Sequence, residues 1–530
     1  MGLELSSLPI EQGLKGLLVL ITLVFAGGTG LATLLRGRGL LWTWALLGVP
    51  VALLLWDVNL MFGLAVGFAS LRAARLGASW HRSDIHDGAD IAASARARLG
   101  VMERLSELAG RLGRGRGWVT AAGMEIGWDA HRRPVYVPVG FTSGCHTLVL
   151  GATGSGKTVT QAWMAGRLIE AGLGAVVIDP KGDELLRGEL QRTAAASGRA
   201  FLEWTPEGPL AYNPYRHGSP GELADKALAG ETFTEPHYQR LAQRYLGHAI
   251  RTMHAAGVPL GPVSLMEHMD PAQLEASARA LAAEDAHAVQ RYLDGLGERQ
   301  RRELGGVRDR LSILAESEAR PWLDAAGGAP ALDLREAVAR RSVVYFRLDA
   351  DRRMLLSQMI AAAIICDLIT ITAHLQRRPV PTAVLIDEFA AVAAEHTGRL
   401  FGKARTAGFS LILGTQELAD LAAAGAALQD QVVGNLEALV AHRQNVPASA
   451  ELIAGIAGTR AAWITAHQTT EGLLGPAPSG LGTRSRGHEY EIHPSTIKRL
   501  ATGVAAVITP GRSQPPTIAR IHHPRDARRR

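Results

Sequence analysis

The chain has 530 residues, 47% of them hydrophobic and 20% charged, which is long enough for two or three folded units with large cores. A formal net charge of +6 suits a phosphate-bearing partner or an anionic membrane surface, but the excess is too small to identify either. Only two cysteines occur, Cys145 and Cys366, so the composition excludes a disulfide framework and a cysteine-based metal cluster.

The N-terminal region is apolar over a length that can cross a membrane. As a helix, the range 14–35 would span about 33 Å, close to the hydrocarbon thickness of a bilayer. A second apolar range, 40–71, is interrupted at Asp57 and Asn59. Apolar character continues too far for a cleaved signal peptide, so we expect residues 1–75 to form a retained membrane anchor.

The sequence leaves two or three membrane spans open. If 40–71 is one tilted helix, the anchor is a two-span hairpin and Arg36 and Arg38 lie outside, against the positive-inside rule. If Asp57 marks a turn, three spans keep these arginines inside, but the third span is short for a bilayer. In either case the basic residues at the end of the anchor and just after it place the rest of the chain in the cytoplasm. These residues are Arg72, Arg75 and Arg82.

A juxtamembrane linker is expected over residues 76–117. The range 89–112 is helical in character and rich in arginine, and a Gly-Arg-Gly-Arg-Gly run follows over 113–117. Short strands are predicted over 118–137 and would begin the next folded unit.

A glycine-rich octet lies between a predicted strand, 147–150, and a predicted helix, 158–170. In this context backbone N–H groups cradle phosphates, Lys157 reaches the β- and γ-phosphates, and the Thr158 hydroxyl binds Mg²⁺. The helix N-terminus adds a partial positive charge at the same point. The sequence therefore predicts an ATP site built from Gly151, Ala152, Thr153, Gly154, Ser155, Gly156, Lys157 and Thr158.

The strand and turn over 175–182 resemble a magnesium-binding strand but lack a base after the aspartate. Asp179 is followed by Pro180 and Lys181, so we interpret the segment as a neighbouring strand of the same sheet.

A long insertion is expected within the nucleotide-binding motor domain, because 230 residues separate Lys157 from Asp387, a carboxylate that follows the apolar strand over 383–386 and is expected at the same site. The range 222–319 has helical spacing and almost no strand signal, and sheet character resumes over 342–348. We therefore assign 118–221 and 340–530 to the motor domain. An inserted all-α domain is assigned to 222–325.

An apolar strand over 383–386 ends in two adjacent carboxylates. Buried parallel strands are continuously apolar in this way, and catalytic groups of open α/β sheets lie at their carboxyl ends. Asp387 is predicted to hold Mg²⁺ and Glu388 to polarise the attacking water, as expected of an ATPase.

Two further residues are candidates for catalysis. Gln416 comes after a strand predicted over 409–414, where it could sense the γ-phosphate, orient water or be a solvated amide. Arg405 lies at the end of a helix predicted after the acidic strand. It could be an arginine finger offered to a neighbouring subunit, or it could complement the helix dipole.

The C-terminal part continues with a Gly/Pro/Ser-rich loop expected over 471–487, which carries Arg484 and Arg486. A strand near 503–508 and a basic tail over 525–530 close the chain.

These motifs, in this order, resemble the TraG/TraD-like coupling proteins of bacterial conjugation, membrane ATPases related to the RecA-like DNA pumps. The resemblance covers nearly the whole chain, and its most distinctive parts are the Asp-Pro-Lys-Gly and Ile-Asp-Glu-Phe-Ala runs. It is carried by the N-terminal apolar spans and by residues 151–158, 177–182, 212–214, 385–390 and 414–416.

The resemblance implies an α/β fold, a RecA-like P-loop motor domain with an inserted all-α domain and N-terminal transmembrane helices. It implies ATP and Mg²⁺ as cofactors, a homo-hexamer, and a multi-pass location in the cell membrane with the ATPase domain cytoplasmic. The implied partners are single-stranded DNA with its attached relaxase and the components of a type IV secretion channel. The loop between the first two apolar stretches is shorter than the periplasmic segment of many relatives.

The function that this resemblance implies is ATP-driven passage of single-stranded DNA towards the secretion channel. Two other functions stay open on the sequence. The chain could be a docking receptor that recruits secreted protein substrates and uses ATP mainly for conformational switching. It could also be a chromosome-segregation pump of the same superfamily, although the small membrane region and the large insertion do not favour that reading.

Overall fold

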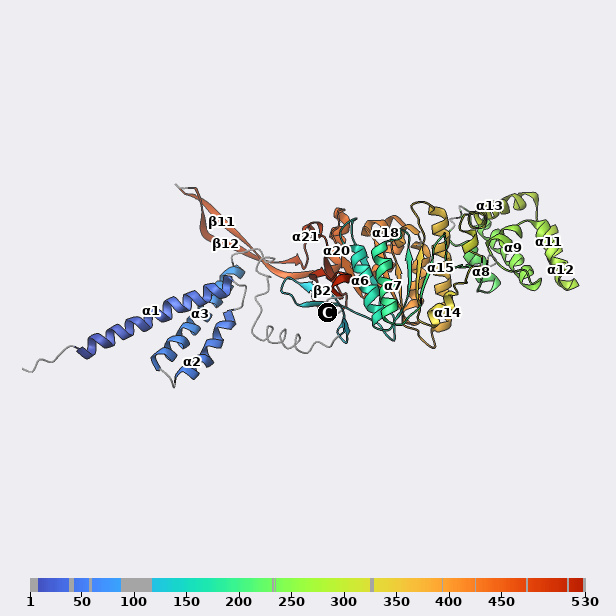
Figure 1. The fold of residues 1–530 in the computed structure, drawn as a ribbon. Helices are drawn as coiled ribbons and strands as arrows, with labels where there is room; N and C mark the ends of the chain where they lie inside the picture. The colour runs from blue at the N-terminus through green and yellow to red at the C-terminus, as the bar shows by residue number, and fades with distance from the viewer. Residues whose placement is uncertain are drawn as a thin grey trace, which may run out of the picture. The chain divides into compact units, whose positions relative to one another are not determined.

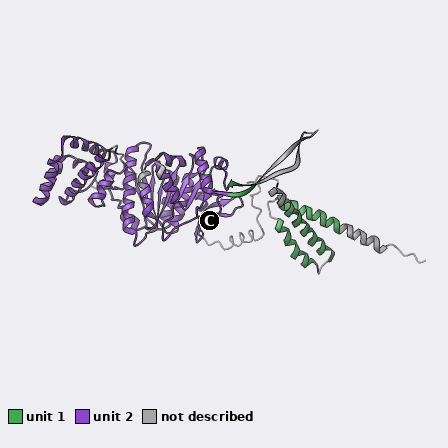
Figure 2. Ribbon diagram, turned by 180° about the vertical axis from the view of Figure 1, so that it is seen from behind, with its two compact units in different colours: residues 1–117, 460–489 green, residues 118–459, 490–530 purple. Residues whose placement is uncertain are grey.

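The computed structural model describes residues 8–37, 42–56, 60–86, 117–230, 233, 235–324, 328–392, 394–424, 426–472, 475–511 and 514–527. Within it the chain divides into two compact units, coloured separately in Figure 2. The first contains residues 1–117 and 460–489, and the second contains residues 118–459 and 490–530. The expected linker over 76–117 falls largely outside the described residues.

The N-terminal part of the first unit is helical. Its elements are α1 (Leu8–Gly37), the 3₁₀ helix η1 (Trp42–Leu47), α2 (Gly48–Trp56) and α3 (Leu60–His86). Small residues let these helices approach closely, since a Cβ added at Gly28 would lie 2.9 Å from the Ala69 carbonyl oxygen. The buried residues between the helices are few and mostly alanine, including Ala32, Ala73 and Ala74. Most large apolar side chains described here therefore face outward.

The same unit contains the strands β11 (Thr459–Gly472) and β12 (Gly475–Tyr490), which form a two-stranded sheet. The loop predicted over 471–487 is thus mostly strand. Small residues predict turns by local preference, but pairing between two long strands determines the backbone here. The Arg486 guanidinium lies 5.9 Å from the centre of the Trp463 ring, while the Arg484 side chain lies outside what the structure describes.

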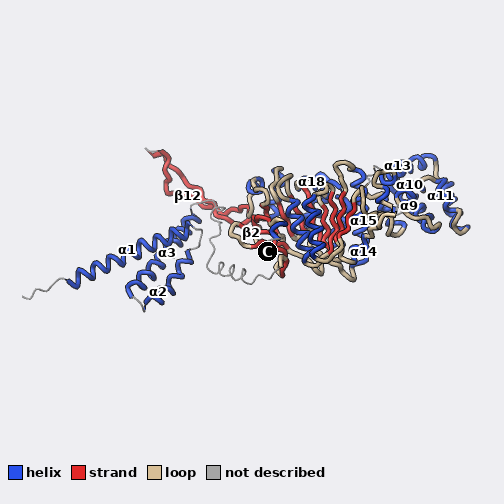
Figure 3. Tube along the Cα trace, viewed as in Figure 1, coloured by secondary structure: helices blue, strands red, loops and turns tan. Residues whose placement is uncertain are grey.

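A twelve-stranded sheet forms the centre of the second unit (Figure 3). Its order is β1-β2-β14-β13-β10-β4-β9-β8-β5-β7-β6, with β3 paired to β2. The run from β10 to β6 is parallel, whereas β13, β14 and β2 pair antiparallel. The strands are β1 (Val119–Thr120), β2 (Gly123–Asp129), β3 (Pro134–Val137), β4 (Thr147–Leu150), β5 (Gly174–Asp179), β6 (Phe201–Trp204), β7 (Val343–Arg347), β8 (Thr382–Ile386), β9 (Phe409–Thr415), β10 (Ala438–Ala441), β13 (Val504–Ile508) and β14 (Thr517–Ile521).

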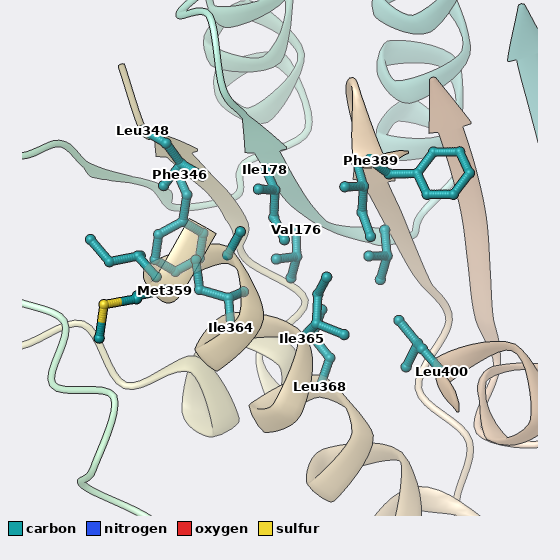
Figure 4. Close-up of a cluster of buried hydrophobic side chains, with 14 of the residues drawn as sticks. Val176, Ile178, Phe346, Leu348, Met359, Ile364, Ile365, Leu368, Phe389 and Leu400 are labelled. Carbon is teal, nitrogen blue, oxygen red and sulfur yellow. The ribbon is translucent and has the colours of Figure 1, made fainter. Parts of the chain in front are cut away.

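Helices cover both faces of this sheet, and successive strand residues point to opposite sides. On one face Val177 packs in a core with α6 (Lys157–Glu170) and α7 (Glu184–Ala196). On the other, Val176 and Ile178 pack in a core with α15 (Met354–Leu375), as Figure 4 shows. The strands are therefore apolar on both faces, as buried parallel strands require.

Among the described residues, one helix is long and apolar enough to cross a membrane, and it is α15. This helix is mostly buried, and Ile364, Ile365 and Leu368 on it are fully enclosed against the sheet. It is a core helix of the α/β unit. The shorter apolar helices Leu20–Arg36 and Trp42–Leu55 fall in the region expected to form the anchor.

Between β6 and β7, the described residues from Pro220 to Trp322 form helices without a strand, at one end of the unit (Figure 1). They are α8 (Pro220–Ala227), α9 (Pro236–Ala255), α10 (Pro262–Glu267), α11 (Pro271–Ala278), α12 (Ala283–Asp294), α13 (Glu298–Ala315) and η2 (Arg320–Trp322). A capping box of Ser219 and Glu222 starts α8.

The remaining helices lie between the later strands, except α22, which follows the last strand. They are α14 (Leu334–Ala339), α16 (Phe389–Val392), α17 (Ala394–Ala404), α18 (Leu418–Ala424), α19 (Ala426–Gly434), α20 (Pro447–Ala457), α21 (Pro494–Lys498) and α22 (Pro524–Ala527).

Candidate active site

The glycine-rich loop joins the carboxyl end of β4 to the first turn of α6. Gly154 and Gly156 have φ angles of 75° and 112°, a region that favours glycine. Neighbouring segments hold the loop through its backbone. Ala152 N–H donates to the Arg443 carbonyl at 3.1 Å, and Gly503 N–H donates to the Ser155 carbonyl at 2.9 Å.

Lys157 and the two carboxylates after β8 meet in one buried cluster. The Lys157 Nζ lies 2.9 Å from Asp387 Oδ1 and 2.5 Å from Glu388 Oε1. All three residues are at most 9% exposed. These groups meet because β9 alone separates β4 from β8, and all three strands are parallel and end at the same edge.

Gln161, one turn along α6, was missed by the sequence reasoning. Its Nε2 donates to Asp387 Oδ1 at 2.9 Å. The contact passes over β9 at Gly414, where an added Cβ would lie 2.1 Å from Gln161 Nε2 and 2.5 Å from Asp387 Oδ1. A glycine inside an apolar strand was the available signal, since it marks a close approach.

Asp179, at the end of β5, fixes the turn that follows it. Its carboxylate accepts hydrogen bonds from the backbone N–H groups of Lys181, Gly182 and Asp183 and from the Tyr345 hydroxyl. Burial raises the pKa of Asp179, and these hydrogen bonds oppose that rise. As predicted, β5 is a neighbouring strand, since it pairs directly with β8.

The same turn brings a second lysine to the cluster. Lys181 Nζ lies 2.9 Å from Glu388 Oε1, although its side chain is 46% exposed. Burial lowers the pKa of Lys181, but the hydrogen bond and charge of Glu388 outweigh burial and leave that pKa raised. The sequence carried no local signal for this contact, because it depends on the pairing of β5 with β8.

Two other predicted site residues, Gln416 and Thr158, lie beside the glycine-rich loop. Gln416 follows β9 beside the loop, and Thr153 Oγ1 donates to its Oε1 at 3.5 Å. Thr158 is the second residue of α6 and is half-buried at its N-terminus. Both therefore belong to the same edge of the sheet as Lys157.

Arg405 is not brought to this cluster. It precedes β9 and pairs with Glu437, which precedes β10, so both lie at the amino ends of the strands. Glu437 also accepts a hydrogen bond from the backbone N–H of His146, just before β4. Arg405 therefore lies at the sheet edge opposite to the glycine-rich loop, and a role towards a neighbouring subunit stays a prediction.

His442, just after β10, contacts the first turn of α6 next to the glycine-rich loop. Its Nδ1 lies 3.1 Å from the Val504 carbonyl oxygen, so Nδ1 donates and Nε2 can accept from the Thr160 hydroxyl at 2.8 Å. Burial lowers the pKa of His442 to about 4, which keeps the ring neutral. The first turn of α6, which contains Thr160 and is preceded by Gly156, therefore packs against a neutral imidazole held in one orientation.

The residues present fit a nucleotide with Mg²⁺. Among the residues that the structure describes, the buried Ser155 Oγ in the loop has no hydrogen-bond partner. The helix N-terminus and Lys157 supply positive charge, and Asp387 supplies the hard oxygen that Mg²⁺ prefers.

Two family models match the chain. The model described as helicase HerA, central domain, matches residues 125–319, and the model described as the TraM recognition site of TraD and TraG matches residues 381–501. No curated protein matches.

Solved structures of a bacterial conjugative coupling protein are similar in fold. The unbound monoclinic form of TrwBdeltaN70 matches with a TM-score of 0.54 at 17% identity over 78% of this chain and 90% of that one. TrwB with a non-hydrolysable ATP analogue gives 0.52 at 16% identity, and TrwB with ADP and Mg²⁺ gives 0.51 at 17%. These two cover 78% of this chain and 91% of the TrwB chain.

A parallel sheet with a glycine-rich loop and a buried lysine at its carboxyl edge is the arrangement of a nucleotide-binding ATPase. Within that class, the two models and the structural similarity confirm the resemblance to TraG/TraD-like coupling proteins.

Proposed function

We propose that the chain is an ATP-driven coupling protein that recruits a DNA–relaxase substrate and pumps single-stranded DNA towards a type IV secretion channel. The observation that carries the proposal is that Lys157 meets Asp387 and Glu388 in one buried cluster. Glu388 lies 231 residues after Lys157 in the sequence. Mg²⁺ and ATP would supply the metal and the reactive phosphate. The match to the model described as the TraM recognition site of TraD and TraG supports conjugation as the setting.

Each residue of the cluster has a separate role in this proposal. Lys157 binds and neutralises phosphate oxygens, while Thr158 and Asp387 hold Mg²⁺. Glu388 orients the attacking water and accepts its proton, and Gln416 contacts the terminal phosphate. Gln161 holds the Asp387 carboxylate in place by a hydrogen bond.

We also propose that α1, α2 and α3 form the membrane anchor, with the α/β unit in the cytoplasm. The support is an outward-facing set of large apolar side chains in this unit, which would be costly in water. Small residues between the helices are typical of packing in membranes. The exposed residues include Phe25, Leu34, Leu53, Leu54, Phe62 and Phe68.

The remaining parts of the proposal concern assembly and partners. A homo-hexameric ring would provide a central path for the DNA strand, and the helical segment between β6 and β7 would contact the relaxase-bound substrate. Arg405 could then act on the site of a neighbouring subunit.

The test is ATP turnover by the full chain in detergent, with and without single-stranded DNA. Turnover should rise with DNA and be lost in Lys157→Ala, because the phosphate-binding cation is removed. Salt must be varied, since phosphate contacts weaken steeply with ionic strength. ATP turnover that ignores DNA across the salt range contradicts the pump.

A docking receptor for protein substrates is the second candidate. The family model that matches residues 381–501 favours this candidate, because its description names a site that recognises another protein, TraM. DNA-independent turnover together with tight capture of a substrate protein would support the receptor.

A further inference from the structure

Glu388 is held by two lysines from opposite sides. Lys157 and Lys181 both contact the same carboxylate oxygen, Oε1, at 2.5 and 2.9 Å. Lys157 comes from the side of β4 and β9, whereas Lys181 follows β5, the neighbour of β8 on the other side. The Glu388 side chain is only 11% exposed, and the two ammonium groups are the cationic partners that offset the removal of its carboxylate from water.

The backbone at Lys181 and at Glu388 is held in a defined conformation. Asp179 ties down the turn that carries Lys181 by accepting three backbone N–H groups. Glu388 itself has a φ of 44°, unusual for a residue with a side chain. Such a conformation persists only where the surroundings hold it, and it often marks a functional site.

The two lysines differ in their role in the proposed reaction. Lys157 belongs to the glycine-rich loop and is 9% exposed, whereas the Lys181 side chain is 46% exposed and outside that loop. When Lys157 turns to phosphate oxygens, Glu388 loses one of its two cationic partners.

We propose that Lys181 is a positioning residue for Glu388, which keeps the carboxylate oriented towards the attacking water after Lys157 has turned to phosphate. The inference rests on the proposed function. It adds that hydrolysis depends on a lysine outside the glycine-rich loop, carried by the Asp-Pro-Lys-Gly turn.

The first test separates turnover from substrate binding. Lys181→Met in the full chain should lower kcat by roughly 10- to 100-fold while KM changes less than about threefold, because a misplaced general base slows chemistry. Lys498→Met, at an exposed lysine of α21, is the matched control and should leave both unchanged. Lys181→Arg should recover part of the kcat, since it retains the charge.

A double-mutant cycle tests whether Lys181 acts through Glu388. Residual single-turnover rates would be compared for Lys181→Met, Glu388→Gln and the double variant. The double variant should be no slower than Glu388→Gln alone, because the positioned carboxylate is already absent.

A second readout needs no nucleotide. Acetylation of lysines by an N-hydroxysuccinimide ester, measured by peptide mass spectrometry, reports whether each amine is held in an ion pair. Glu388→Gln should speed labelling of Lys181 several-fold and leave Lys498 unchanged. Glu451→Gln, at an exposed carboxylate of α20, should affect neither lysine.

Three outcomes would overturn the inference. These are unchanged kinetics in Lys181→Met, a rise in KM with kcat retained, and labelling of Lys181 that ignores Glu388→Gln. A loss of folding in every Lys181 variant, seen as a lost thermal transition, would assign the lysine a structural role instead. If the wild-type chain does not hydrolyse ATP, the proposed function fails, while the labelling result still decides the contact.

Discussion

The Gln161 side chain on α6 donates a hydrogen bond of 2.9 Å to Asp387, the residue that follows β8. This bond crosses β9 at Gly414, the one residue of that strand without a side chain. The proposed metal ligand is therefore positioned by a residue from the helix that follows the glycine-rich loop. Any change in the spacing of α6 and β8 at this point would move the carboxylate.

Gly414→Ala tests this relationship. The added Cβ would lie 2.1 Å from Gln161 Nε2, so the amide must move away from Asp387. We expect ATP turnover to fall roughly 10-fold or more, with a higher Mg²⁺ concentration needed for half-maximal rate. Gly434→Ala, where an added Cβ meets nothing within 4 Å, is the control. Unchanged Mg²⁺ dependence would contradict the role of this contact.

Lys226 and Asp367 form a largely buried ion pair between α8 and α15. Lys226 also donates to the Pro214 carbonyl at 2.7 Å, and the Tyr212 hydroxyl donates to Asp367 at 2.5 Å. Lys226→Met should destabilise the protein by about 3 kcal/mol, because it leaves a buried carboxylate without its cation. Thermal unfolding measures the loss.

Replacing both partners of that pair provides the control. Lys226→Met with Asp367→Leu should recover much of the lost stability, since no uncompensated charge remains. A double variant as unstable as Lys226→Met would show that the loss comes from packing.

The neutral His442 predicts a dependence of stability on pH. Its pKa falls from 6.5 to about 4 on folding, so the unfolded chain binds the proton more tightly. The stabilisation is complete above pH 6.5 and is lost as the pH falls towards 4, by up to about 3 kcal/mol.

His442→Gln removes that titration. The thermal midpoint of the wild-type chain should fall more steeply between pH 7 and 5 than that of the variant, since other titrating groups are common to both. Parallel profiles would show that His442 is not kept neutral by the fold.

The membrane proposal predicts that the full chain stays with the membrane pellet after carbonate washing and is released by detergent. A chain that begins at Trp118 should remain in the soluble fraction, because α1, α2 and α3 are absent. Release of the full chain by carbonate would contradict an integral anchor.

Much of the α/β unit could be predicted because its signals are local. The octet around Lys157 and the apolar strand before Asp387 each carry their own pattern, and the helical spacing after Glu222 indicated the helices between β6 and β7. The contact of Lys181 with Glu388 could not be predicted, since it depends on strand order. The position of Arg405 at the sheet edge opposite to the glycine-rich loop also depends on strand order. The strands β11 and β12 form through their pairing with each other, which no local pattern indicates.

Displacement of streptavidin from the end of biotinylated single-stranded DNA tests the pump most directly. We expect the full chain to displace streptavidin only with ATP, and we expect Lys157→Ala and Glu388→Gln each to abolish the displacement. DNA-bound wild-type protein that hydrolyses ATP without displacing streptavidin would contradict the pump.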